Sequence, residues 1–234
     1  MKVVVNIKYR NYREQIEQFI NGGVTGERIR VLRNELSKCR LAEMSVVVKR
    51  FAVPNWFQRI IYTLFRKSKA ARSYNNALIL RTMGIETPEP IAYIEQYRFG
   101  LFHTGYYIAR FSTNSTLSHI TTLSDSEQRL VAIDLAEFTA KMHSFGVAFY
   151  DYNSQNILYK KCDDKYYFEI VDINRMDFKS KPLSIKDSIK TINRLRMDFS
   201  SLFETTFLEH YAMLRGFNWQ VFSGSVLLCQ GLKK

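Results

Sequence analysis

Residues 143–158 read HSFGVAFYDYNSQNIL, and this stretch decides the fold of the chain. Asp151 stands on a predicted loop after a long predicted helix, and Asn156 follows five positions later, directly before a predicted strand. A further predicted strand, Tyr166–Val171, ends at Asp172. Carboxylate and amide oxygens in this order are the groups that phosphoryl transfer requires, because the protein contributes positioning and charge rather than covalent chemistry.

A lysine in the first half of the chain completes the pattern. Lys49 follows the apolar run Val46–Val48 near the end of a predicted strand. Phosphoryl transfer needs a carboxylate that orients the attacking hydroxyl, and we predict Asp151 as this catalytic residue. Asn156 and Asp172 are the predicted ligands of Mg²⁺, and together with Lys49 they are the predicted binding residues for ATP between two lobes. Each piece alone is common, but the order Lys, helix, hinge, helix, Asp-loop-Asn, hairpin, Asp is typical of kinases.

Hydrophobic periodicity divides the chain into a strand-rich first half and a helix-rich second half. In the first half, strands are predicted over residues 2–8, 28–32, 36–41, 44–51, 91–97 and 101–110, and helices over 12–20, 56–65 and 70–83. A Ser-, Thr- and Asn-rich stretch at 111–118 is the predicted linker, and Ser124 with Glu127 predicts a capping box at the start of a long helix. The predicted fold class is α+β: a bilobal protein-kinase-like fold with an antiparallel-sheet N-lobe over 1–110 and a mainly helical C-lobe over 111–234.

Composition limits the other classes of function. The chain has 234 residues, 46% of them hydrophobic, which is too apolar for a disordered protein. Its net charge of +12 favours an anionic partner, but no nucleic-acid recognition motif is present, so nucleic acid is not the expected partner. The three cysteines (Cys39, Cys162 and Cys229) form no C-x-x-C pair, which argues against a zinc site and favours a reduced, cytoplasmic setting.

Several motifs resemble those of one known family. They are Val48-Lys49-Arg50-Phe51, the run RTMGIETPEP at 81–90, the Asp151 loop and the run VDINRM at 171–176. Together they resemble the lipopolysaccharide kinases, protein-kinase-like enzymes that phosphorylate Kdo or heptose sugars of the lipopolysaccharide inner core. The resemblance runs from about Met44 to Met176. It implies a bilobal kinase fold, ATP with Mg²⁺, and a sugar hydroxyl as acceptor on a lipid-linked glycan at the inner face of the cytoplasmic membrane.

The chain also departs from the usual kinase pattern. Phe149-Tyr150-Asp151 replaces His-Arg-Asp, Asp172-Ile173-Asn174 replaces Asp-Phe-Gly, and Asn34-Glu35 occupies the predicted turn where a Gly-rich loop would lie. No acidic residue occurs between Glu43 and Glu86, so the helix after Lys49 has no Glu to pair with it. Two alternatives therefore stay open: a catalytically impaired pseudokinase that acts as a nucleotide-binding or interaction scaffold, and an active kinase for a protein or small molecule.

The predicted helix over 56–65 is amphipathic and is followed by the basic run Arg66–Arg72. An aromatic helix with a basic flank can lie in a membrane interface. The simpler interpretation is that its apolar side packs on the first lobe. The first interpretation predicts peripheral association with an anionic membrane surface.

Overall fold

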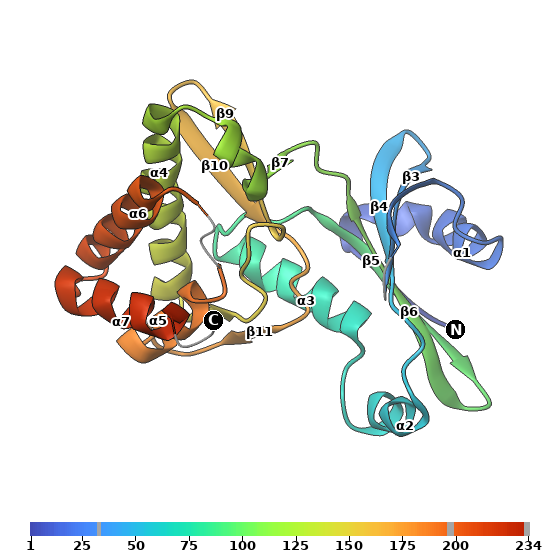
Figure 1. Ribbon diagram of the computed structural model, residues 1–234. Helices are drawn as coiled ribbons and strands as arrows, with labels where there is room; N and C mark the ends of the chain where they lie inside the picture. The colour runs from blue at the N-terminus through green and yellow to red at the C-terminus, as the bar shows by residue number, and fades with distance from the viewer. Residues whose placement is uncertain (32–33, 196–198, 232–234) are drawn as a thin grey trace. The chain divides into compact units, whose positions relative to one another are not determined.

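The computed structural model describes residues 1–31, 34–195 and 199–231, which form two compact units (Figure 1). Unit 1 consists of Met1–Thr82 and Pro88–Thr113. Unit 2 consists of the short segment Met83–Thr87 and the chain from Asn114 onward. In the part of the chain that is described, every helix is too short or too polar to cross a lipid bilayer.

Unit 1 is built on an antiparallel sheet with the strand order β1-β5-β6-β4-β3-β2. Its strands are β1 (Lys2–Val5), β2 (Glu27–Val31), β3 (Glu35–Leu41), β4 (Met44–Arg50), β5 (Pro90–Arg98) and β6 (Leu101–Arg110). The predicted meander is confirmed as β2-β3-β4, and the predicted hairpin is confirmed as β5-β6. β4, which carries Lys49, pairs with β6 on one side and β3 on the other.

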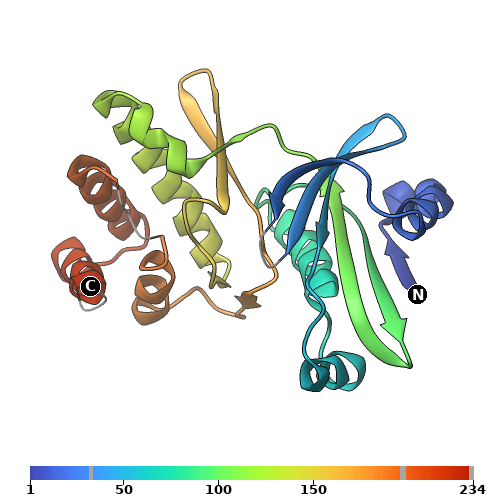
Figure 2. The same ribbon diagram turned by 45° about the vertical axis from the view of Figure 1, so that its right-hand side comes forward.

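Helices cover both faces of this sheet (Figure 2). They are the 3₁₀ helix η1 (Ile7–Tyr12), α1 (Arg13–Asn21), α2 (Trp56–Leu64) and α3 (Lys69–Thr82). Ile16 of α1 belongs to a buried cluster with Val46 and Val48, whereas Tyr74 of α3 belongs to a second cluster with Phe51. Because side chains alternate along a strand, Lys49 and Phe51 share the sheet face that α3 covers.

Unit 2 is mainly helical. Its elements are β7 (Ser115–Thr116), η2 (Leu117–Thr122), α4 (Asp125–Ser144), β8 (Val147–Phe149), β9 (Ile157–Cys162), β10 (Lys165–Ile170), β11 (Met176–Phe178), α5 (Ile185–Ile192), α6 (Ser201–Leu214) and α7 (Trp219–Gly231). Ser124 caps α4 by accepting a hydrogen bond from the Glu127 amide, as predicted. The buried side of α4 packs on α6 and β10, so this long helix is the centre of the unit.

Three predicted boundaries are wrong. The polar stretch at 111–118 is not a linker throughout, because Ser115 and Thr116 form β7 and pair with β9. Glu35 does not lie in the turn but begins β3, whereas Leu32 and Arg33, on the other side of it, lie outside the described residues. The strand predicted over 2–8 ends at Val5. At Val5 and at Ser115–Thr116 the boundary is set by pairing with a strand far away in the sequence, which the local composition does not indicate.

Candidate active site

The loop that carries Asp151 is fixed from both sides. Before it, Gly146 has φ +75° at the end of α4, and a Cβ there would lie 2.3 Å from the Lys179 carbonyl oxygen, so only glycine fits. Directly after Asp151, the fully buried Tyr152 shares a hydrogen bond of 2.6 Å with Thr139 of α4. Burial also raises the pKa of the Tyr152 hydroxyl, which keeps it neutral. The loop is therefore anchored to the core helix of unit 2.

Asp151 is held through its backbone and through its carboxylate. Its carbonyl oxygen accepts hydrogen bonds from the side-chain amides of Asn156 at 2.9 Å and Asn153 at 3.0 Å. Its Oδ1 forms an ion pair with the Arg175 guanidinium at 3.0 Å. The Asp151 side chain is 25% exposed. The carboxylate is thus oriented by the protein and still accessible to a substrate.

The structure brings the three predicted residues of unit 2 together. Asn156 bonds to Asp151 as described, and its carbonyl oxygen accepts a hydrogen bond from the Val171 amide at 2.9 Å, immediately before Asp172. Asp172 has φ +56°, a left-handed conformation that aspartate adopts more readily than most residues. Its Oδ1 accepts a hydrogen bond of 2.7 Å from the buried Asn174. Asp151, Asn156 and Asp172 therefore belong to one connected cluster.

The segment Met83–Thr87 braces the strand that leads to Asp172. The Ile170 amide donates to the Glu86 carbonyl oxygen at 3.0 Å, and the Thr87 hydroxyl donates to the Ile170 carbonyl oxygen at 2.7 Å. Thr87 is buried, and Gly84 has φ +64° at the turn that begins the segment. The Gly-Ile-x-Thr-Pro run thus fixes the end of β10 two residues before Asp172.

The side chains of Asn156 and Asp172 offer oxygen atoms of the kind that binds a magnesium ion. Because the Asn156 amide nitrogen bonds to the Asp151 carbonyl, its Oδ1 is the atom that a cation would meet. A carboxylate and an amide oxygen are the hard ligands that Mg²⁺ prefers. Among the described residues, no three His, Cys, Asp or Glu side chains group closely enough to hold a metal by themselves. Mg²⁺ at Asn156 and Asp172 would therefore take its other ligands from phosphate and water, as it commonly does.

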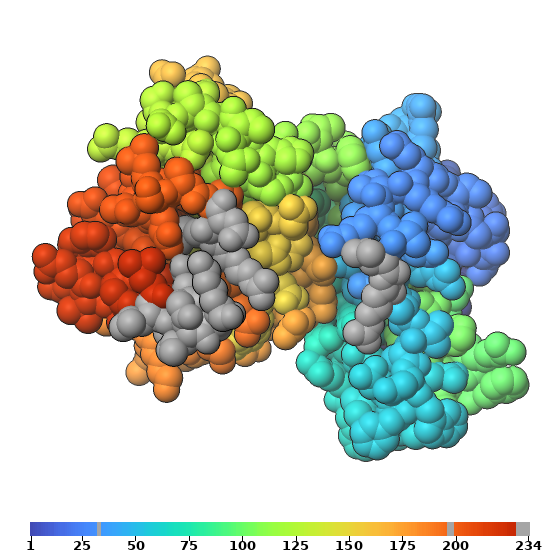
Figure 3. Space-filling model, viewed as in Figure 1, coloured from blue at the N-terminus to red at the C-terminus, as the bar shows by residue number. Residues whose placement is uncertain are grey.

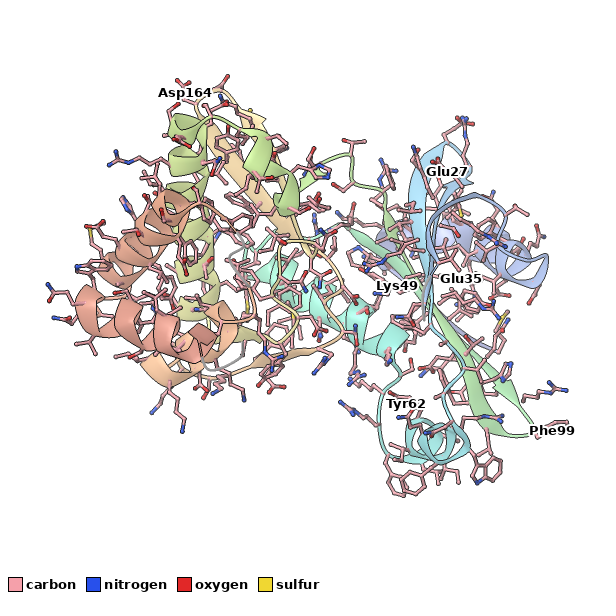
Figure 4. The ribbon with its side chains drawn as sticks, in the orientation of Figure 1. Glu27, Glu35, Lys49, Tyr62, Phe99 and Asp164 are labelled. Atoms are coloured by element: carbon pink, nitrogen blue, oxygen red, sulfur yellow. The ribbon has the colours of Figure 1, made fainter. Side chains whose placement is uncertain are left out.

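Lys49 belongs to unit 1 (Figure 4). It lies on β4 opposite Leu36 of β3 and Tyr107 of β6. The side chain is half-buried, and Nζ lies 5.3 Å from the centre of the Phe51 ring. A lysine stem on this apolar surface holds its ammonium group in a restricted region, which suits a phosphate contact.

The helix beside Lys49, α3, carries no acidic side chain. Tyr74 of α3 is buried, and its ring lies 5.3 Å from that of Tyr93 on β5. Asn75 and Asn76 are half-buried. The sequence shows that no carboxylate occurs from Met44 to Ile85, so α3 supplies no Glu for Lys49. The Asn34 side chain, directly before β3, accepts a hydrogen bond from the Ala52 amide at 3.2 Å.

Sequence reasoning assigned no role to Asn174 and Arg175. Both belong to the Asp-Ile-Asn-Arg run, and their positions close after Asp172 could have indicated that they contact the site. His143, in the last turn of α4, is fully buried and shares a 2.7 Å hydrogen bond with Tyr211. Burial, with a smaller contribution from Arg215, lowers its pKa to about 3. The imidazole is therefore neutral and contributes to packing.

Comparison of the sequence with family models and with curated proteins gives no match. Solved structures are similar. WaaP, solved in complex with acyl carrier protein, has a TM-score of 0.70 and 14% identity over 100% of this chain and 98% of that one. The ADP-bound aminoglycoside phosphotransferase APH(2'')-Ib has a TM-score of 0.52 and 13% identity over 91% of this chain and 85% of that one. The chain therefore has the protein-kinase-like fold, with an antiparallel-sheet first part and a helical second part, that its resemblance to the lipopolysaccharide kinases predicted.

Proposed function

We propose that this protein is an ATP-dependent kinase that phosphorylates a sugar hydroxyl, Kdo or heptose, of the lipopolysaccharide inner core. The observation that carries the proposal is the connected cluster of Asp151, Asn156 and Asp172 on a kinase-like fold. For the acceptor, the support is the family resemblance of the motifs and the similarity to WaaP, a lipopolysaccharide core heptose kinase. A lipid-linked acceptor of this kind places the reaction at the inner face of the cytoplasmic membrane.

In this proposal each residue has a defined role. Asp151 accepts a hydrogen bond from the acceptor hydroxyl and directs its oxygen toward the γ-phosphorus. It takes the proton as the new P–O bond forms and the bond from the γ-phosphorus to the β–γ bridging oxygen breaks, which releases ADP. Arg175 keeps the Asp151 carboxylate in place. Lys49 binds the phosphates of ATP, and Asn156 and Asp172 hold Mg²⁺. When bound, Mg²⁺ neutralises the charge that develops on the phosphate oxygens.

A specific observation favours a second candidate. The absence of a carboxylate from Met44 to Ile85 leaves Lys49 without the helix Glu that active protein kinases use. A pseudokinase that binds nucleotide and serves as a scaffold would tolerate this loss. Nucleotide binding without turnover would identify that candidate.

The deciding experiment is phosphoryl transfer from labelled ATP to extracted lipopolysaccharide, compared between the wild type and Asp151→Asn. We expect the wild type to label the acceptor and the variant to lose turnover, because the amide cannot accept the proton. ATP affinity should stay within a few-fold, because Asp151 is not a predicted nucleotide ligand. A protein acceptor that is labelled instead would overturn the sugar assignment, and an aminoglycoside that is labelled instead would overturn the lipopolysaccharide assignment. Because WaaP was solved with acyl carrier protein, an inactive preparation is retested with that protein added.

A further inference from the structure

The helix α2 is attached to unit 1 through its polar side. The Arg59 side chain donates hydrogen bonds to the carbonyl oxygens of Phe102 at 2.8 Å and Arg98 at 3.3 Å. The Thr63 hydroxyl accepts a hydrogen bond from the Phe102 amide at 2.9 Å, and the Tyr62 ring lies 5.5 Å from the Phe102 ring. Residues 59, 62 and 63 therefore face the β5–β6 hairpin, and the opposite side of the helix faces outward.

That outward side is apolar. α2 contains no buried residue, although its mean hydropathy is well above that of the neighbouring helices. The exposed fractions are 65% for Trp56, 70% for Phe57, 66% for Leu64 and 81% for Phe65. The interpretation that the apolar side of this helix packs on the first lobe therefore holds only in part, because Ile60 and Ile61 are half-buried and the four larger side chains are exposed. The helix is attached through Arg59, Tyr62 and Thr63. Trp56, Phe57, Leu64 and Phe65 remain exposed to solvent.

A second apolar group lies at the same end of unit 1. Phe99, at the turn of the β5–β6 hairpin, is 89% exposed, and Figure 4 shows it beside the end of the unit that carries α2. The hydrogen bond from Arg59 to the Arg98 carbonyl joins the two directly. We call the set Trp56, Phe57, Leu64, Phe65 and Phe99 the apolar end. In Figure 3 the atoms of α2 form the lower end of unit 1, with the hairpin beside them.

Positive charge surrounds the apolar end, and negative charge is missing from the segments that form it. Residues 44–85 contain eight Lys and Arg and no Asp or Glu, and residues 96–124 likewise contain no acid. Arg66 and Lys67 are exposed directly after Phe65, and Arg98 precedes Phe99. Burial lowers the pKa of His103 on β6, and Arg59, Arg98 and Arg50 lower it further, which reports a positive local potential.

We infer that the apolar end is a docking surface for an anionic phospholipid bilayer. A fluid interface accepts side chains that project from a helix and a turn without a complementary shape, and Trp and Phe insert at the level of the headgroups. The adjoining Arg66, Lys67 and Arg98 attract the acidic lipids. This inference goes beyond the proposed function, since it concerns binding and needs no catalytic turnover.

The test is co-sedimentation of the full chain with vesicles, without nucleotide or acceptor. The vesicles are phosphatidylcholine alone or phosphatidylcholine mixed with phosphatidylglycerol, at low and high salt. Binding should require phosphatidylglycerol and weaken with salt. Each Lys or Arg near an acidic leaflet contributes about 1 kcal/mol, about fivefold in affinity, so Arg66→Gln with Lys67→Gln should weaken binding about thirtyfold. Trp56→Ser, Phe57→Ser and Phe65→Ser combined should weaken it by tenfold or more.

The matched controls lie in unit 2. Lys181→Gln with Lys186→Gln removes the same charge from exposed positions, and Met213→Ser removes an apolar side chain that is 65% exposed. Both should bind vesicles like the wild type, and melting curves confirm that all variants fold. The inference is overturned if the wild type does not bind anionic vesicles. It is also overturned if the variant with Trp56, Phe57 and Phe65 replaced binds them as tightly as the wild type. The inference is also overturned if the chain binds an acidic soluble protein but does not bind vesicles. A chain that binds vesicles but transfers no phosphate contradicts only the proposed function.

Discussion

At the scale of single residues, the guanidinium beside Asp151, the proposed catalytic carboxylate, does not come from the residue directly before it. The residue before Asp151 is Tyr150, whose hydroxyl donates to Asp177 at 2.6 Å, so it cannot act as the arginine of His-Arg-Asp. Arg175 supplies the guanidinium instead, 24 positions after Asp151. Its carbonyl oxygen also accepts a hydrogen bond from the Tyr150 amide at 3.1 Å. Arg175 therefore acts as a positioning residue for Asp151.

Arg175→Ala should lower kcat about tenfold to hundredfold, because a hydrogen bond between charged groups contributes roughly 1.5–3 kcal/mol. The KM for ATP should stay within about threefold, since Arg175 positions the base and not the nucleotide. Arg175→Lys should recover part of the rate, because it retains the charge but not the planar geometry. Steady-state kinetics, with the concentrations of both substrates varied, measures the effects on kcat and on the KM for ATP separately. An unchanged kcat in Arg175→Ala would show that the ion pair is incidental.

Asp172→Ala should abolish the stabilisation that ATP and Mg²⁺ give the wild type. A ligand that binds only the folded state at about 100 times its Kd adds roughly 2.7 kcal/mol, which raises Tm by about 5 °C or more in a chain of this size. Thermal denaturation with and without both ligands measures the shift. Asp164→Ala, at the exposed turn of the β9–β10 hairpin, is the control and should shift like the wild type. An equal shift in Asp172→Ala would remove this residue from the site.

At the scale of elements, α3 limits how firmly Lys49 can be held. In an active protein kinase the strand Lys pairs with a Glu on the following helix, and both must be in place to grip the phosphates. Here Tyr74 fills the sheet-facing position with a ring in contact with Tyr93, whereas Asn75 and Asn76 are half-buried amides. An amide can accept a hydrogen bond from Lys49 but does not match the charge of a carboxylate. We therefore expect turnover below the roughly 1–100 s⁻¹ of ordinary kinases.

A new acid on α3 should raise that turnover. Asn75→Glu is the first choice and should increase kcat about tenfold, with Asn76→Glu as the next position. Tyr74→Glu should cost stability, because it places an acid in an aromatic cluster. Asn75→Gln is the matched control, since it has the length of Glu without the charge. If the wild type already works at ordinary rates, and no position gives a gain, another group holds Lys49 and this explanation is wrong.

At the scale of the whole molecule, His143 links the two main helices of unit 2. It lies near the end of α4, and its Nδ1 shares a hydrogen bond with Tyr211 of α6, whose hydroxyl oxygen also accepts one from Arg215 at 3.1 Å. Burial lowers the pKa of His143 to about 3 from its ordinary 6.5. The folded chain therefore excludes a proton that the unfolded chain binds below pH 6.5.

This difference predicts acid-dependent stability. His143 favours the folded state fully above its unfolded pKa of 6.5, and this contribution is lost as the pH falls toward the folded value of about 3. From about pH 6 to 4 the free energy of unfolding should fall by about 1.4 kcal/mol per pH unit on account of this residue. Urea denaturation across that range should show a shallower slope in His143→Gln. His119→Gln, at an exposed site, should retain the wild-type slope. Parallel slopes in all three proteins would contradict the assignment.

Local sequence was enough to predict the main strands and helices and the residues of unit 2 that cluster, but not the short strands β7, β8 and β11. The valine run Val46–Val48, the capping box at Ser124 and the hairpin before Asp172 are local signals, because neighbouring residues set backbone preference. Asp151 and Asn156 are five positions apart on one loop, so chain connectivity alone keeps them close. The kinase-like fold could therefore be predicted from the order of these signals.

Only the tertiary structure decided the contacts between distant parts of the chain. Thr87 bonds to Ile170, 83 positions away, and Arg175 reaches Asp151 across 24 positions. The orientation of α2 also depends on contacts with a distant part of the chain. Its pattern shows that one side is apolar, but whether that side faces the sheet or the solvent depends on where the β5–β6 hairpin offers partners to Arg59 and Thr63. Periodicity fixes the faces of an element, whereas the free energy of long-range hydrogen bonding and packing selects which face is used.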